Sequence, residues 1–367
     1  MSEPLKRESA VPAKAEEKVH ADRKRWLSLA FVSVSLFILA VDDTVLNVAL
    51  PSISRDMGSS ASQLQWMIDA YVLVFAALLL TMGSIGDRIG RKRMLQGGLV
   101  LFGAFSAWAA LSTSSGMLIT ARAFLGFSGA MIMPSTLSIL SATFEDPKER
   151  AQAIAIWAAV FALGLGVGPL MAGALLEHYS WGSVFVVNIP IVIIALIGGH
   201  LFVKESSDEM VSKPDIPGTI LSIAGLFLLV YGIIKAGEES WTQTNVILAL
   251  SSAGVILSVF AWWERRAPNA MLPLRFFKNM SFTGANATLI LVTFCLFGIL
   301  FFLSQYFQSV QGYTPLQTGI RILPMALMLT VFAAGSARVA MYLGTKFTVS
   351  LGCIIATGGL LMLSLFS

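Results

Sequence analysis

The chain has 367 residues, of which 56% are hydrophobic and only 13% are charged. A soluble domain carries about 25% charged residues, so the composition excludes an ordinary soluble protein and predicts an all-α chain that crosses a membrane many times. The formal net charge of +4 does not indicate nucleic-acid binding, because the basic residues lie in short loops between apolar segments. The two cysteines, Cys295 and Cys353, lie inside apolar segments and predict neither a disulfide nor a metal site.

The first 26 residues are polar, and an apolar segment from Leu27 to Ala49 follows them. A cleaved signal peptide would have a shorter apolar segment and a small-residue cleavage site. This segment is instead long enough to cross a bilayer, which takes about 20 residues. We therefore expect residues 1–26 to form a disordered cytoplasmic tail that precedes an uncleaved first helix.

Eleven apolar segments are long enough to be membrane spans. They begin near Leu27, Gln63, Gln96, Met117, Ala153, Trp181, Ile216, Asn245, Phe282, Leu316 and Phe347. If the N-terminus is cytoplasmic, 21 of the 25 Lys and Arg residues lie in the tail or in cytoplasmic loops, as the positive-inside rule requires. This orientation leaves Ser367 outside, and the last segment ends without a polar flank, so we expect a chain that is truncated at the end of a helix.

Acidic residues within spans are costly and are therefore functional candidates. The first segment contains Asp42 and Asp43, and the second contains Asp69. A helix rise of about 1.5 Å per residue places Asp42 and Asp69 in the same outer layer of the bilayer. Burial raises the pKa of a carboxyl and a nearby cation lowers it, so a pocket that balances the two can couple to protons. The alternative is that these residues cap or hydrogen-bond at wet helix ends, which for Asp43 is equally well supported.

Arg122 lies in the fourth segment, and an arginine inside a membrane helix needs a buried partner. Asp42 or Asp69 could supply that partner, and Arg122 would then tune the proton affinity of the carboxylate. A purely structural ion pair is the alternative. His20, His178 and His200 are isolated, and no P-loop or metal-ligand spacing is present. We therefore expect no catalytic residue, no metal and no cofactor.

The loop after the second segment reads Gly83-Ser-Ile-Gly-Asp87-Arg88-Ile-Gly90-Arg91-Lys-Arg. The carboxylate of Asp87 could accept hydrogen bonds from a helix N-terminus and pair with Arg88 or Arg91. Such a network would hold the cytoplasmic side closed. The alternative is an ordinary basic loop that follows the positive-inside rule.

In the fifth segment, small residues recur every four positions at Gly164, Gly168 and Ala172, and Pro169 and Gly173 lie next to two of them. Small residues let helices approach closely, and proline bends a helix. This pattern predicts a packing seam that can open and close, or a generic packing face.

A weak internal repeat relates the start of the second segment, residues 60–63, to the start of the tenth, residues 314–317. Gly90-Arg-Lys and Gly344-Thr-Lys follow at the same offset. Repeated halves are common in carriers. We therefore divide the chain into a tail (1–26), a six-helix bundle (27–203), a linker with two inserted spans (204–264) and a partial C-terminal bundle (265–367).

Several motifs together resemble the fourteen-helix drug:proton antiporter branch of the major facilitator superfamily. The loop 83–92 is similar to motif A, Arg122 with Gly126 to motif B, and Gly164 to Gly173 to motif C, although Ala172 replaces the first of a closing glycine pair. Residues 42–51 (D-x-T-V-x-N-V-A-L-P) resemble the first helix of this branch, and residues 181–190 resemble the opening of its sixth.

This resemblance implies alternating-access export of lipophilic cationic drugs, driven by the proton gradient. The protein would be a monomer in a bacterial or archaeal cell membrane. Asp42 and Asp69 would exchange protons and substrate, Asp87, Arg88 and Arg91 would form the inner gate, and three further helices would complete the family fold. The alternatives are an exporter of a single metabolite, antibiotic or siderophore, and a non-transporting scaffold or fragment.

Overall fold

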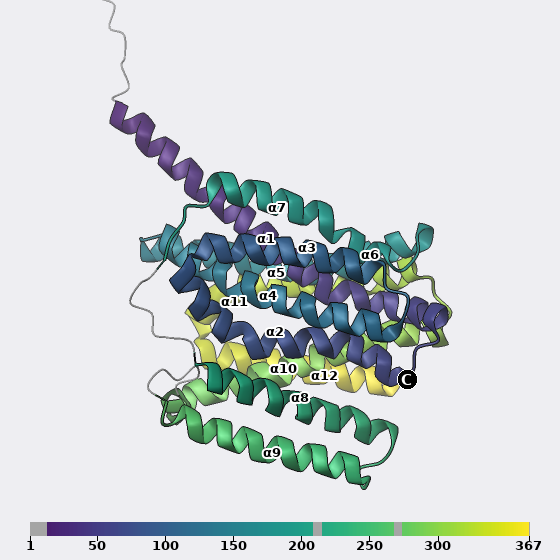
Figure 1. The fold of residues 1–367 in the computed structure, drawn as a ribbon. Coiled ribbons are helices and arrows are strands. Elements are labelled where there is room, and N and C mark those ends of the chain that lie inside the picture. Colours follow the sequence, from purple (N-terminus) through teal and green to yellow (C-terminus); the bar gives the residue numbers. More distant parts are fainter. Residues whose placement is uncertain (1–12, 208–214, 268–273, 367) are drawn as a thin grey trace, which may run out of the picture.

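The computed structural model describes residues 13–207, 215–267 and 274–366, and within these ranges the chain is helical and contains no strand (Figure 1). The first half contains α1 (Ala13–Met57), α2 (Ala61–Ile89), α3 (Arg91–Ala110), α4 (Ser115–Thr143), α5 (Pro147–His178), α6 (Ser183–Val186) and α7 (Asn188–Phe202). The remainder contains α8 (Ile216–Glu238), α9 (Thr244–Glu264), α10 (Met280–Gln305), α11 (Pro315–Leu343) and α12 (Thr345–Phe366), with a 3₁₀ turn η1 (Leu274–Lys278) and a π-helical turn η2 (Tyr306–Val310).

Each of the eleven predicted spans lies on one of these helices, with α6 and α7 together forming the sixth. Nine helices in the described part of the chain are long and apolar enough to cross a membrane. The other two predicted spans lie on α3, which opens with three basic residues, and on α11, which contains Arg321 and Arg338. The basic residues at the start of α3 lower the mean hydropathy of that helix. The predicted all-α, polytopic architecture is confirmed.

The first helix differs from its prediction at its N-terminal end. It begins at Ala13, within the stretch 1–26 that we expected to be disordered, and residues 1–12 lie outside the described part. The segment 13–25 is rich in Ala, Glu, Lys and Arg, which have high helix propensities. The candidate span begins at Lys24, so α1 extends beyond the membrane-length segment without a break.

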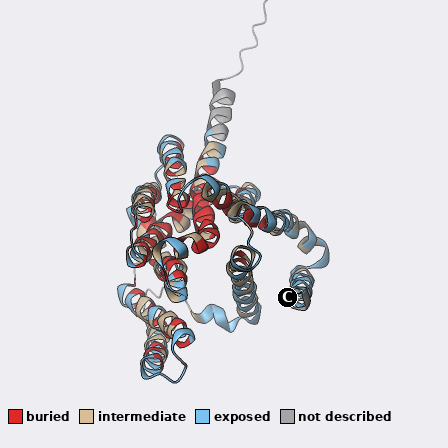
Figure 2. Ribbon diagram, turned by 90° about the vertical axis from the view of Figure 1, so that its right-hand side faces the viewer, coloured by how far each residue is buried: buried red, intermediate tan, exposed pale blue. Residues whose placement is uncertain are grey.

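The hydrophobic core lies in the bundle formed by α1 to α7. Helix α1 is central, because it contacts α4, α5 and α7, while α2 and α3 both pack on α4. In its most apolar stretch 72% of the residues are buried, against 11% for the span that contains α10. Figure 2 shows the same contrast, with buried residues concentrated in the bundle. Polar groups inside this bundle are therefore shielded from water and lipid.

Helices α8 and α9 form a hairpin beside α2 (Figure 1). The hydroxyl oxygens of Thr81 and Thr219 lie 2.6 Å apart and join α2 to α8. Near the other end of this contact, the ring of Trp66 packs against those of Phe227 and Tyr231. The hairpin is thus an addition to the outside of the first bundle, in keeping with the predicted inserted pair.

Helices α10 and α11 connect the last part of the chain to the first bundle. Helix α11 packs along α5, and α10 contacts α1. Gln308 Nε2 donates a hydrogen bond of 3.0 Å to the carbonyl oxygen of Val48. Thr318 and Ile322 in the first turns of α11 are buried, whereas Tyr342 near its end is 87% exposed. The two halves therefore meet at the ends that sequence analysis places on the outer side.

Candidate functional site

A buried ion pair between α1 and α4 occupies the centre of the first bundle. Arg122 Nη1 lies 2.5 Å from Asp42 Oδ2, and both side chains are fully buried. The structure therefore brings together two of the three residues predicted to couple protons. A charge-assisted hydrogen bond in a region of low dielectric constant is strong, and its loss would leave a buried charge without a partner.

Helix α2 fixes the position of the Arg122 guanidinium. Arg122 Nε donates to the carbonyl oxygen of Met67 at 2.9 Å, and the guanidinium carbon lies 4.4 Å from the ring centroid of Tyr71. The close approach of α2 to α4 depends on Gly126 of α4, because a Cβ at this position would overlap the backbone of Tyr71. The arginine is thereby held by an ion pair, a carbonyl group and an aromatic ring.

Asn188, at the start of α7, completes the surroundings of Asp42. Its Nδ2 donates to Asp42 Oδ1 at 2.8 Å and to Ser106 Oγ of α3 at 3.2 Å. Sequence analysis did not assign a role to Asn188. The available signal was an amide side chain in an otherwise apolar span, next to Pro190, but its partner on α1 follows only from the packing of the helices.

Asp43 lies on the edge of this cluster. Its side chain is partly buried and lies within electrostatic range of both Arg122 and Asp42. Two carboxylates and one guanidinium carry one formal negative charge in excess. A proton or a cationic ligand can neutralise that charge, which is the property that an exchange site requires.

Asp69 does not join the pair. Met67 and Tyr71 flank it at two residues on either side, and a step of two residues rotates a helix by about 200°. Since both of these neighbours contact Arg122, Asp69 lies on the opposite side of α2. It is partly buried, and the side chain of Gln65 lies beside it. The predicted common layer therefore contains two separate acidic positions.

The predicted cytoplasmic loop contains an ion pair at the junction of α2 and α3. Asp87 Oδ1 lies 2.6 Å from Arg91 Nε, whereas Arg88 is exposed. Of the two predicted partners, the structure therefore shows Arg91. Gly83, earlier in the motif, packs against Pro134 of α4, where an added Cβ would lie 3.3 Å from the proline Cβ.

The N-terminus of α3 is capped by Glu205 rather than by Asp87. The backbone amides of Lys92 and Arg93 donate to the two carboxylate oxygens of Glu205 at 3.0 and 3.2 Å. Our prediction that Asp87 accepts from this helix end is therefore wrong, because Asp87 lies on the preceding helix and bonds Arg91. Glu205 follows the sixth span and comes near α3 only in the folded chain, so no local pattern identifies it.

Gly90 is required at this junction for two reasons. Its φ of +120° disfavours any L-residue, and a Cβ would lie 2.8 Å from the Glu205 carboxylate. We expect Gly90→Ala to destabilise the protein by about 1–3 kcal/mol, measured as a lower apparent unfolding temperature in detergent. Gly97→Ala in α3 is a matched control, because its Cβ would make an ordinary 3.5 Å contact with the side chain of Met131 in α4. Equal unfolding temperatures for the two variants would contradict the assignment.

The glycines of the predicted seam on α5 pack against two different helices, α1 and α11. An added Cβ at Gly164 would lie 2.6 Å from Ala40 Cβ, and one at Gly168 would overlap Thr44 Oγ1, so both glycines pack on α1. Gly173 instead faces Leu316 of α11, and a Cβ at Gly319 of α11 would lie 2.5 Å from the carbonyl oxygen of Pro169. Helix α5 thus packs closely against both halves.

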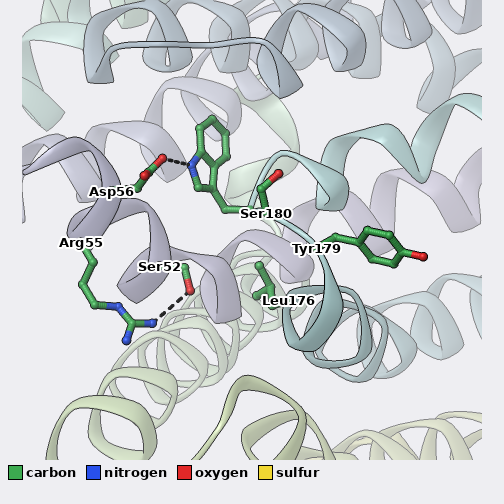
Figure 3. A pocket seen from close by; sticks show the side chains of 7 residues that line it. Ser52, Arg55, Asp56, Leu176, Tyr179 and Ser180 are labelled. Atoms are coloured by element: carbon green, nitrogen blue, oxygen red, sulfur yellow. Dashed lines mark hydrogen bonds between the residues drawn. The ribbon is translucent and has the colours of Figure 1, made fainter.

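A separate pocket of about 350 Å³ lies at the ends of α1 and α5 (Figure 3). Trp181 Nε1 donates to Asp56 Oδ2 at 2.7 Å, and Arg55 Nη2 donates to Ser52 Oγ at 3.3 Å. At a rise of about 1.5 Å per residue, Asp56 is roughly 21 Å along α1 from Asp42. The pocket is therefore distinct from the buried ion pair. Within the described residues, no group of three or more His, Cys, Asp or Glu side chains could hold a metal ion.

Comparisons with known proteins show the family to which the chain belongs. A family model described as Major Facilitator Superfamily matches residues 32–367. The chain is 37% identical over 344 residues to the multidrug efflux pump LfrA of Mycolicibacterium smegmatis, covering 94% of this chain and 68% of LfrA. It is 33% identical to the multidrug resistance protein Stp of Mycobacterium tuberculosis, covering 93% of this chain and 64% of Stp.

The fold is also similar to a solved structure. The crystal structure of the peptide transporter POT in complex with sulfate superposes with a TM-score of 0.62 at 14% sequence identity, covering 87% of this chain and 69% of that one. At this identity the likeness concerns the fold alone. The chain spans about two thirds of the length of the curated relatives that it matches.

Proposed function

Because this chain belongs to the Major Facilitator Superfamily, we propose that it acts in proton-coupled export of lipophilic, cationic compounds across the cell membrane, with its N-terminus in the cytoplasm and as a monomer. The observation that carries this proposal is the buried ion pair of Asp42 and Arg122 with the partly buried Asp43 at its edge, because the three groups carry one excess formal negative charge. The similarity to LfrA and Stp supports multidrug efflux as the form of transport.

The acidic residues would have different roles, in proton exchange or in cation binding, according to their exposure. Asp42 is fully buried and paired with Arg122, so it would take up and release the proton. Asp43 and Asp69 are only partly buried and would attract the cation. Protonation of Asp42 would release Arg122 from its partner, and Asp43 is the nearby carboxylate that could replace it.

The driving force is sufficient for uphill export. One proton that moves inward releases about 2.3 kcal/mol per 100 mV of membrane potential, and about 1.36 kcal/mol more per unit of pH difference. No cofactor is needed for this coupling. The seam on α5 and the Asp87–Arg91 pair would serve as the parts that open and close on the two sides.

The test is substrate-dependent proton movement in inverted vesicles that contain this chain. We expect several unrelated cations to dequench a pH probe, Asp42→Asn to abolish the response, and Asp69→Asn to lower the affinity for cations. A response to one compound only would favour the single-substrate alternative. Absence of any response in well-inserted protein would contradict the proposal for this chain, and the same assay on LfrA serves as the positive control.

A further inference from the structure

We propose that Asn188 is a positioning residue whose amide group holds Asp42 in both its ionised and its protonated state. The inference rests on the proposed role of Asp42 in proton exchange. It assigns a task to a residue on the sixth span, which contributes neither to the predicted gates nor to the predicted ion pair.

The position of Asn188 is fixed by a break in the sixth span. Helix α6 ends at Val186 and α7 begins at Asn188. Pro190 has no N–H group with which to bond the carbonyl of Val186, so a continuous helix is disfavoured here. The side chain of Asn188 is fully buried and lies between Asp42 of α1 and Ser106 of α3.

The ionised form of Asp42 explains the observed orientation of the amide. A carboxylate only accepts hydrogen bonds, so the NH₂ group of Asn188 must face it. In this arrangement Asn188 Oδ1 is buried and has no hydrogen-bond partner. The same is true of Arg122 Nη2. A buried acceptor without a partner is costly, and its retention beside a titratable group suggests that it is used in another state.

Protonation of Asp42 would supply that other state. The carboxyl group would then carry an O–H donor, and rotation of the amide would present Oδ1 in place of the NH₂ group. The amide oxygen has two lone pairs, so it can accept from both the Asp42 carboxyl and the Ser106 hydroxyl. An apolar side chain offers neither arrangement, and a carboxylate offers only the acceptor.

Other charged or titratable groups face Asp42 from the surrounding helices. They are the charged Arg122 from α4 and Asp43 from α1 and the neutral but titratable Tyr71 from α2, while α3 and α7 contribute the uncharged Ser106 and Asn188. Arg122 stabilises the ionised carboxylate and Asp43 opposes it. Asn188 differs from both because its contact with Asp42 can persist after the proton binds.

Infrared difference spectroscopy of reconstituted protein between pH 4 and 9 tests the inference without any transported compound. The carboxyl C=O band that is absent in Asp42→Asn reports the protonation of Asp42. We expect Asn188→Leu to shift the frequency of this band, because the protonated carboxyl group loses the amide oxygen that would accept from its O–H. Asn188→Ser also removes the amide, so it should shift the frequency as well, and it serves if the leucine variant fails to fold.

Asn47→Leu is the matched control. Asn47 is also a buried amide on this part of the bundle, but its Nδ2 donates to the backbone oxygen of Asp43, so the band should keep its frequency. An unchanged band frequency in both Asn188 variants would overturn the inference while leaving Asp42 as a titrating group. No titration of Asp42 in the unmodified protein would overturn both the inference and the proposed coupling. A shifted band frequency in the Asn188 variants, without any export by the unmodified protein, would support the inference and reject the proposed function.

Discussion

Replacing Arg122 with leucine should lower the free energy of unfolding by about 3–5 kcal/mol, because it leaves the Asp42 carboxylate buried without its counter-ion. The ion pair is fully buried and measures 2.5 Å, so water cannot replace the lost partner. The carbonyl of Met67 also loses its donor. Denaturant titration of the protein in detergent, followed by tryptophan fluorescence, measures the loss.

The double variant Asp42→Asn/Arg122→Leu separates charge from packing. Removal of both charges often costs little, because neither is then left buried alone. We expect the double variant to recover most of the stability that Arg122→Leu loses, which a double-mutant cycle expresses as a coupling energy. If the double variant is as unstable as the single one, the loss arises from packing of the arginine and not from the charge of Asp42.

The helices of this fold follow from local sequence patterns, so their positions could be predicted from the sequence. Spans are set by the length and apolarity of each segment, and helix starts by capping residues. Ser60 with Gln63 and Thr314 with Gln317 both form capping boxes. Gly90 and Gly344, at the same offset from these starts, both have positive φ. The weak repeat in the sequence is therefore a repeat of local geometry, in which α11 and α12 correspond to α2 and α3.

The partners of the charged residues depend on how each helix is rotated, and hydropathy does not determine this rotation for a buried helix. Asp42 and Asp69 were both reasonable partners for Arg122. Asp42 is the partner of Arg122 because of the rotation of α2. This helix presents Met67 and Tyr71 to the arginine and places Asp69 on its opposite side. Glu205 and Asn188 were missed for a related reason, since both act on helices that are distant in the sequence.

The contact between α5 and α11 should control the outer side of the transport pathway. Replacing Gly173 with valine would place its Cβ 2.7 Å from the Cα of Leu316 and from the carbonyl oxygen of Pro315. These are backbone atoms, so the helices must separate. Overpacking costs about 1–3 kcal/mol, which corresponds to a shift of about 5–150-fold toward states in which this contact is open. We therefore expect Gly173→Val to abolish export.

Thiol labelling measures the opening directly. Thr318 is fully buried in the first turns of α11, so Thr318→Cys, in a background with Cys295 and Cys353 replaced by serine, reports access to the contact. Its reaction with a membrane-impermeant maleimide from the outer side should be at least about fivefold faster in Gly173→Val. Gly298→Val is the control, because nothing lies within 4 Å of its added Cβ. Equal labelling rates and retained export would show that α5 and α11 only pack together, and the opening and closing would then have to occur elsewhere between the halves.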